Sequence, residues 1–284
     1  MPLCFFGTHR HVNPLTQPVL ASTLHDPRAS MLDQTLRVLP SLQTIFPVIT
    51  VRTSSTTHPD MIHVLRTAGI IVDDCPAPAG DGHKLGLARS QAISLALQHI
   101  SPFILYCDFD RALHWAEYYP AELAETSERI QEFDFTVLGR TGHAWQTHPR
   151  VQRDTEAIIN HVFQLITNLD WDVCTGARGL SRRAAQALLS GCKDENLSTD
   201  VSWPLYLRSL TSSNHGYTQT CILTDGLAFE TQDRHSPEVQ AAGGPDAWLN
   251  QFDANPQRWL ERLELAAGHL RAMLQFVDKP ADNS

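Results

Sequence analysis

The most restrictive feature of the sequence is the apolar run Phe103-Ile104-Leu105-Tyr106-Cys107, which is followed by two acids, Asp108 and Asp110. A strand that is apolar at every position is typical of a parallel sheet with helices on both faces. Open sheets of this kind bind ligands at the carboxyl ends of their strands. In extended backbone, residues two apart point the same way. We therefore expect both carboxylates to face one side at this edge of the sheet.

Short apolar runs alternate with amphipathic stretches over the first half of the chain, as in βαβ units on a parallel sheet. We predict strands at 3–7, 46–51, 70–72, 103–107, 133–138, 172–177 and 218–223. We predict helices at 31–45, 59–69, 84–99, 121–130, 154–169, 181–189 and 256–276. The sequence therefore predicts an α/β fold whose mostly parallel central sheet is flanked by helices.

Composition excludes several classes of protein. The 284 residues carry a net charge of −9 without a Lys/Arg cluster, which argues against a nucleic-acid partner. No stretch approaches the roughly 20 apolar residues of a membrane span, and residues 1–6 lack the basic start of a signal peptide. The six cysteines contain no CxxC pair. We therefore expect reduced, buried thiols in a cytoplasmic protein.

The acids Asp108 and Asp110 indicate a metal site. Two clustered carboxylates repel each other unless a cation or a proton lies between them. Hard divalent ions such as Mg²⁺ or Mn²⁺ take oxygen ligands of this kind. A solvated turn that happens to contain two acids is the alternative. The position at the end of an apolar strand favours the metal site.

The run Gly86-Leu87-Ala88-Arg89-Ser90-Gln91-Ala92-Ile93, ahead of the strand that ends in Asp-Phe-Asp, resembles the segment before the metal motif in family 2-like GT-A glycosyltransferases. The resemblance implies that Asp108 contacts the nucleotide and that Asp110 ligates the metal bridging the diphosphate. It also implies that Arg89 reaches a phosphate, although a surface helix charge is an equal alternative. Thr53 and Lys84 complete the implied nucleotide-sugar-binding set.

The second half of the family pattern has counterparts as well. The stretch 172–183 is similar to the family's acceptor-side strand, glycine turn and helix. Asp200 falls where inverting members carry a Glu-Asp pair whose Asp is the catalytic base. Here Thr199 replaces the glutamate. The alternative is that Ser198-Thr199-Asp200 caps a helix.

Further site residues follow from the same resemblance. His235, in a polar loop after the last strand, is the candidate that completes the metal shell. Trp145, Arg178 and Trp203 are the candidates for acceptor binding. A packed loop aromatic is the alternative for Trp145.

The resemblance implies one GT-A domain, with a nucleotide-sugar-binding half at 1–140 and an acceptor-binding half with a terminal helix at 141–284. The implied function is a metal-dependent, inverting transfer of a sugar from a nucleotide-diphosphate donor to a hydroxyl acceptor. One alternative is an inactive nucleotide-sugar-binding protein with this fold. A sugar-phosphate nucleotidyltransferase is less favoured, because Gly7-Thr8-His9-Arg10 lacks a glycine-rich phosphate loop.

Overall fold

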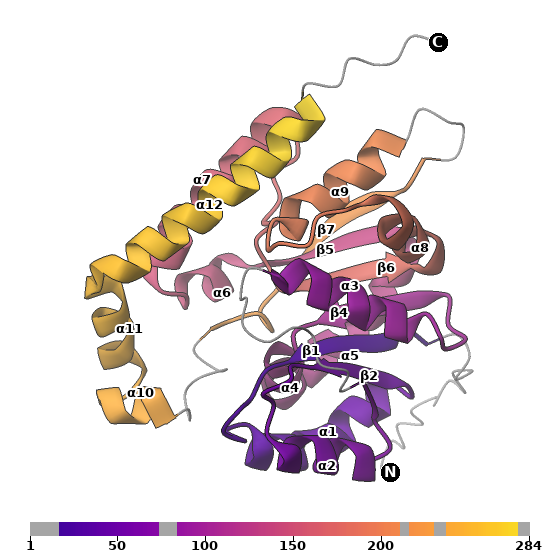
Figure 1. The fold of residues 1–284 in the computed structure, drawn as a ribbon, viewed down its shortest axis with the longest axis vertical. Helices are drawn as coiled ribbons and strands as arrows, with labels where there is room; N and C mark the ends of the chain where they lie inside the picture. Colours follow the sequence, from indigo (N-terminus) through magenta and orange to yellow (C-terminus); the bar gives the residue numbers. More distant parts are fainter. Residues whose placement is uncertain (1–16, 74–83, 211–215, 230–236, 278–284) are drawn as a thin grey trace, which may run out of the picture.

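A computed structural model describes residues 17–73, 84–210, 216–229 and 237–277 (Figure 1). Its seven-stranded sheet has the order β3-β2-β1-β4-β6-β5-β7. The strands are β1 Val19–Leu24, β2 Ile49–Thr53, β3 Ile71–Asp73, β4 Phe103–Cys107, β5 Phe135–Arg140, β6 Ala177–Ser181 and β7 Gln219–Thr224. Only β6 pairs antiparallel with its neighbours, β4 and β5, among the described strands. The predicted α/β fold with a mostly parallel sheet is confirmed.

Helices cover both faces of this sheet (Figure 1). They are α1 Leu32–Ile45, α2 Pro59–Thr67, α3 Leu85–Ala96, α4 Phe109–Tyr118, α5 Pro120–Arg129, α6 Gly142–Gln146, α7 Arg150–Thr167, α8 Arg182–Gly191, α9 Thr199–Ser209, α10 Pro237–Ala242, α11 Pro245–Ala254 and α12 Pro256–Val277. Within the part of the chain that the structure describes, no helix is long and apolar enough to cross a membrane.

The central strand β4 contributes to two hydrophobic clusters, one on each face of the sheet. Leu105 and Cys107 join the cluster that contains side chains of α1, α2, α4 and α5. Ile104 and Tyr106 join the cluster that contains side chains of α3, α8 and α9. The all-apolar sequence of this strand therefore reflects burial on both faces, as predicted.

The predicted strand 3–7 lies outside the described residues. Strand β1 lies at Val19–Leu24, where the sequence predicted neither a strand nor a helix. Ser22 and Thr23 make β1 less apolar than β4, but the strand pairs with β2 on one side and β4 on the other. Pairing with two neighbours fixes it at the centre of the sheet.

The predicted strand 172–177 is also wrong. The strand in this region is β6, Ala177–Ser181, which lies between β4 and β5. Ser181 then caps α8, because its side chain accepts a hydrogen bond from the backbone of Ala184. The helix itself was predicted at 181–189. Because β6 runs in the opposite direction to β4, the carboxyl ends of these two strands lie at opposite edges of the sheet. The helices that follow them, α8 and α4, therefore begin at opposite edges.

The terminal helix α12 lies beside α7, away from the sheet (Figure 1). The Asp253 carboxylate accepts hydrogen bonds from the backbone N–H groups of Arg150 and Val151 at 2.9 Å each. It thereby caps the start of α7 from the segment just before α12. The two helices therefore begin at the same end of the pair.

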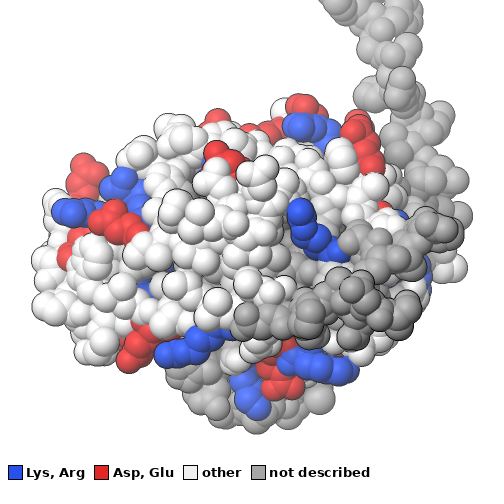
Figure 2. All heavy atoms as spheres, turned by 90° about the horizontal axis from the view of Figure 1, so that it is seen from above, with Lys and Arg blue, Asp and Glu red and all other residues white. Residues whose placement is uncertain are grey.

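Charged side chains are distributed in small groups on the face of the molecule seen in Figure 2. Lys and Arg lie next to Asp and Glu there, without an extended basic area on that face. Cys107 and Cys174 are buried as free thiols, and Cys192 and Cys221 are partly buried as free thiols. Burial raises the pKa of the Cys107 thiol well above its usual range, so it stays protonated.

Asp134 holds three chain segments together at the start of β5. It accepts hydrogen bonds from Ser181 Oγ at 2.9 Å, from Arg183 Nε at 2.6 Å and from the backbone N–H of Thr218 at 2.9 Å. Burial would raise the pKa of Asp134, but hydrogen bonds from Arg183, Thr218 and Ser181 outweigh it and hold the pKa at about 2.

We expect Asp134→Asn to lower the free energy of unfolding by about 1–3 kcal/mol at neutral pH, because the charged acceptor of these hydrogen bonds is lost. The depressed pKa means that the stabilisation is present above the ordinary value of 3.8 and is lost as the pH falls towards about 2. Urea unfolding should show the difference from wild type shrinking over that range. Asp154→Asn, on the surface of α7, is the matched control and should change little.

Candidate functional site

A cleft of about 260 Å³ opens at the edge of the sheet where β4 and β5 end. Four arginines and three acids are among its lining residues: Arg89, Arg111, Arg140, Arg262, Asp108, Glu156 and Asp200. Three of these residues, Arg89, Asp108 and Asp200, were predicted as site residues. The cleft therefore combines the predicted strand-end acid with an excess of positive side chains.

Asp108 is the residue between β4 and α4, at the N-cap position of the helix. Its Oδ1 accepts hydrogen bonds from Tyr106 Oη at 2.6 Å and from Thr23 Oγ1 at 3.0 Å. Its Oδ2 lies 4.0 Å from Arg89 Nη2. The hydroxyl groups of Tyr106 and Thr23 thus fix the orientation of the Asp108 carboxylate. Its other oxygen, Oδ2, is the one nearer to Arg89.

Gly176 leaves the space that this carboxylate occupies. A Cβ atom built on Gly176 would collide with Asp108 Oδ2. The two residues are also joined by a hydrogen bond from the Asp108 backbone N–H to the Gly176 carbonyl oxygen, at 3.1 Å. Glycine is therefore required by close approach to the acid, since any side chain here would displace it.

Asp110 does not extend the strand, and the expected extended arrangement of the two acids is wrong. Helix α4 begins at Phe109, so Asp110 lies in its first turn. Asp110 Oδ1 accepts a hydrogen bond from the backbone N–H of Arg111 at 2.8 Å. An acid in the first turn is favoured by the helix dipole, which gives Asp110 a local structural role as well.

Asp200 lies at the centre of a buried charge cluster, which we call the Asp200 cluster (Arg89, Arg178, Asp200 and His269). Its Oδ1 accepts hydrogen bonds from Arg89 Nη1 at 2.7 Å and from Arg178 Nη2 at 3.1 Å. Its Oδ2 lies 3.6 Å from His269 Nε2. All four residues are at most 5% exposed. The cluster joins α3, β6, α9 and α12.

This environment argues against Asp200 as a general base. Burial would raise the pKa of Asp200, but Arg89, His269 and Arg178 outweigh it and hold the pKa at about 2. A base works best when its pKa lies near the working pH, and a carboxylate held by two guanidinium groups has little tendency to take a proton. The structure fits a residue that positions Arg89 instead. Asp200 does lie in the first turn of α9, but the N-cap residue Ser198 makes no side-chain cap hydrogen bond, so the alternative of a capping Ser-Thr-Asp is not observed either.

A second charge network, missed by sequence reasoning, lines the other side of the cleft. Arg140, the last residue of β5, pairs with Glu156 of α7 at 2.7 Å and with Asp172 at 2.7 Å. Arg262 of α12 pairs with Glu156 at 3.0 Å. Burial, together with Arg140 and Arg111, lowers the pKa of His148 well below its usual range, so this cleft residue is neutral. Arg140 could have been found as a charged residue at a strand end, but Arg262 gives no local signal.

Four further predicted residues, which the structure describes, do not line this cleft. Thr53 is buried at the end of β2, and Lys84 is an exposed residue just before α3. Trp145 is half-buried, and the Arg140 guanidinium carbon lies 4.4 Å from its ring centroid. Trp203 is 3% exposed in the core beside α8, and we drop it from the site. His235 lies outside the described residues.

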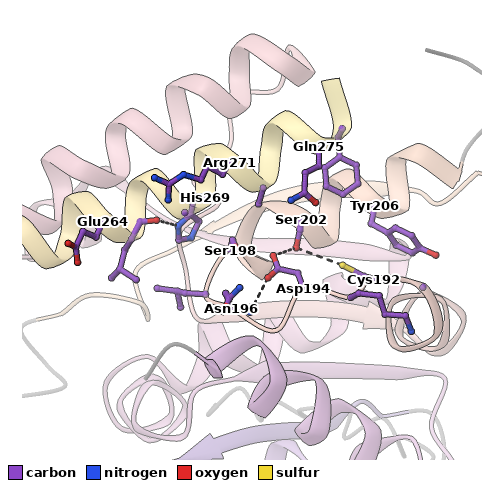
Figure 3. Close-up of a pocket in the computed structure, with 17 residues that line it drawn as sticks. Cys192, Asp194, Asn196, Ser198, Ser202, Tyr206, Glu264, His269, Arg271 and Gln275 are labelled. Carbon is purple, nitrogen blue, oxygen red and sulfur yellow. Dashed lines mark hydrogen bonds between the residues drawn. The ribbon is translucent and has the colours of Figure 1, made fainter. Parts of the chain in front are cut away.

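A larger cavity, of about 680 Å³, lies between α12 and the loop that joins α8 to α9 (Figure 3). In that loop the Asp194 carboxylate accepts a hydrogen bond from Ser202 Oγ at 2.8 Å. A small pocket lined by Asp200, His269 and Leu197 adjoins both this cavity and the cleft. The Asp200 cluster therefore forms the wall between the two.

Comparison with known proteins extends the description of the fold. No family model matches the sequence, and no curated protein matches it. Solved structures of glucosyl-3-phosphoglycerate synthase from Mycobacterium tuberculosis do match. The complex with Mn²⁺, UDP and phosphoglyceric acid has a TM-score of 0.50 and 11% identity, over 94% of this chain and 80% of that chain.

The chain has a GT-A fold. Two further structures of the same synthase, one of them with Mg²⁺ and UDP, match less closely. Their TM-scores are 0.48 and 0.45 at 12% and 10% identity, over 79% and 73% of this chain and 78% and 70% of theirs. At such identities the likeness concerns the GT-A fold alone.

We expect Asp200→Asn to lower the free energy of unfolding by about 3–5 kcal/mol, because removing the carboxylate leaves two buried guanidinium groups without their anion. Thermal and urea unfolding would measure the loss. Asp170→Asn, at an exposed position after α7, is the control and should leave the free energy of unfolding unchanged. A variant as stable as wild type would show that the Asp200 cluster does not hold these elements together.

Proposed function

We propose that the chain is a metal-dependent glycosyltransferase that passes a sugar from a nucleotide-diphosphate donor to a hydroxyl acceptor. The observation that carries the proposal is the position of Asp108. This residue directly follows β4 and lines a cleft that Arg89 and Arg111 also line. The GT-A fold supports it. The synthase that shares this fold binds Mn²⁺ or Mg²⁺ together with UDP.

The carboxylates of Asp108 and Asp110 are the proposed metal ligands. Among the described residues, no group of three or more His, Cys, Asp or Glu side chains could hold a metal by itself. Mg²⁺ and similar ions are commonly held by one or two carboxylates plus substrate phosphates and water, so two acids fit a metal that arrives with a diphosphate. The absence of a side chain at Gly176 lets the Asp108 carboxylate lie at the cleft, where it can take part in such a site. When bound, the ion would offset charge on the leaving diphosphate.

The arginines of the cleft have the proposed role of binding the donor's phosphates. Arg89 is held in place by Asp200 and lies near Asp108. Arg111 donates a hydrogen bond to the Ala228 carbonyl oxygen at 3.3 Å, and its guanidinium carbon lies 5.5 Å from the Phe229 ring centroid. Guanidinium groups fixed before the donor binds stabilise developing negative charge without reorganising.

Thr53 and Lys84 remain proposed contacts of the nucleotide, because β2 ends and α3 begins on the same side of the sheet as Asp108. Trp145 remains a proposed acceptor contact through its stacking with Arg140. Arg178 is assigned a positioning role, since its guanidinium is bound by Asp200 and by the carbonyl oxygens of residues 173, 175 and 177. The inverting mechanism required Asp200 as the catalytic base, so the stereochemistry of the transfer is not part of the proposal. The free buried thiols support a cytoplasmic location.

We expect Asp110→Ala to abolish Mn²⁺-dependent binding of a nucleoside diphosphate while leaving the fold intact, because one of two metal ligands is lost. Calorimetry with UDP, in the presence and absence of Mn²⁺, would measure the change. Asp60→Ala, an exposed acid in the first turn of α2, is the matched control for removing an acid at this position of a helix. Unchanged affinity in the Asp110 variant would remove the basis for the metal site.

We expect the wild-type protein to hydrolyse a nucleotide sugar slowly in the presence of Mn²⁺, since transferases leak to water when no acceptor is present. The assay is release of nucleoside diphosphate from a panel of nucleotide sugars with and without the metal. Asp108→Asn should reduce the release by at least about tenfold, because the fixed carboxylate is lost. Metal-dependent binding without any release would favour the alternative of an inactive nucleotide-sugar-binding protein.

A further inference from the structure

Helix α12 carries a second apolar stripe beside its core-facing side, and most of its side chains are exposed. The core-facing side of the helix includes Ala266, His269 and Met273. The second stripe follows spacings of three and four residues in strict alternation, and we call it the α12 seam: Leu260, Leu263, Ala267, Leu270, Leu274 and Val277. Such a heptad spacing is the pattern of helices that pack against another helix along their length.

Four side chains of the α12 seam are exposed in the isolated chain, while Ala267 and Leu270 are partly buried. Leu260, Leu263, Leu274 and Val277 are 50%, 49%, 55% and 51% exposed. An amphipathic helix on a protein surface normally directs polar side chains outward. The seam runs from Leu260 to Val277, so at about 1.5 Å per residue it offers a contact line of about 27 Å. A row of large apolar side chains of this length marks an interaction surface.

The neighbouring helix α7 broadens this surface. Its Ile158 and Leu165 are 46% and 70% exposed. Val162 lies between them in the sequence and packs against the same hydrophobic cluster as Leu270 of the seam. Both helices therefore pack against the same hydrophobic cluster and also carry exposed apolar side chains.

Two charged residues of opposite sign flank the α12 seam. Glu264 and Arg271 are both exposed at the rim of the larger cavity (Figure 3), and in the sequence they follow directly after Leu263 and Leu270. Among the described residues, neither forms an ion pair. They occupy equivalent heptad positions one repeat apart. In an antiparallel pair of identical helices, Glu264 of one would therefore lie beside Arg271 of the other.

We propose that the α12 seam is a docking surface for a second copy of this chain, with the two α12 helices antiparallel across a two-fold axis. In this arrangement Leu263 lies opposite Leu274 of the second copy, Leu260 lies opposite Val277, and the smaller Ala267 lies opposite Leu270 near the axis. The same two-fold axis forms the Glu264–Arg271 pair twice. Such self-complementary contact is what a two-fold homodimer requires.

The charge pattern favours a second copy over a membrane surface. Helices that lie on anionic membranes carry Lys and Arg along their polar face. Here the flanking charges have opposite signs, and the whole chain has a net charge of −9. The proposal is independent of the glycosyltransferase activity, since no seam residue lines the cleft.

The test is the mass of the full chain in solution, measured by light scattering or sedimentation over a series of concentrations. Wild type should be a dimer, and the double variant Leu263→Glu with Leu274→Glu should have a mass about twofold lower. Leu36→Glu with Ile100→Glu is the matched control, because these two side chains are exposed elsewhere, and it should stay dimeric. Unchanged thermal unfolding of each variant's monomer would show that it still folds.

Charge reversal tests the antiparallel register. Glu264→Arg and Arg271→Glu should each raise the dimer dissociation constant roughly tenfold, because each places two like-charge contacts across the axis. Combining both substitutions should restore wild-type affinity. A monomeric wild type, a dimer that the double leucine variant leaves intact, or binding of the monomer to anionic lipid vesicles through α12 would overturn the proposal.

Discussion

The structure around the cleft depends on one buried carboxylate, Asp200. Taking a carboxylate out of water costs several kcal/mol, and only close pairing with other charges offsets that cost. Arg89 and Arg178 supply the pairing at 2.7 and 3.1 Å. Since the partners come from α3 and β6 while Asp200 comes from α9, these elements can take only the arrangement that keeps all three groups together.

The same carboxylate determines the electrostatics of the cleft. By binding Nη1 of Arg89, it leaves Nη2 of that guanidinium beside Asp108, so one arginine lies between two acids. Arg140 is held in a comparable way by Glu156 and Asp172 on the opposite wall. Both arginines are therefore held in place by acids before any ligand binds. Fixed cations next to one partly exposed acid suit a diphosphate that brings its own metal ion, because the metal balances the acid and the arginines balance the phosphates.

Elements with a strong local pattern could be predicted from the sequence. Strand β4 was found because every side chain is apolar, and α12 because its apolar residues recur at helical spacing. Strands β1 and β6 were missed for a physical reason. Residues 19–24 and 177–181 contain hydroxyl, glycine or arginine residues, and they are strands because both of their edges pair with neighbours distant in sequence. Hydrogen bonds to strands distant in sequence produce no periodic pattern of apolar residues in the strand's own sequence.

The residues of the candidate site also differ in whether a local sequence pattern reveals them. Asp108 could be found because carboxyl ends of parallel strands bind ligands, but the turn into α4 that carries Asp110 required knowing that residue 109 starts a helix. His269 and Arg262 reach the site from a helix more than half the chain away from β4. The role of Arg178 could not be predicted, because the predicted strand 172–177 ended before it. Once β6 is known to span Ala177–Ser181, the need of a buried arginine for an anion explains its pairing with Asp200.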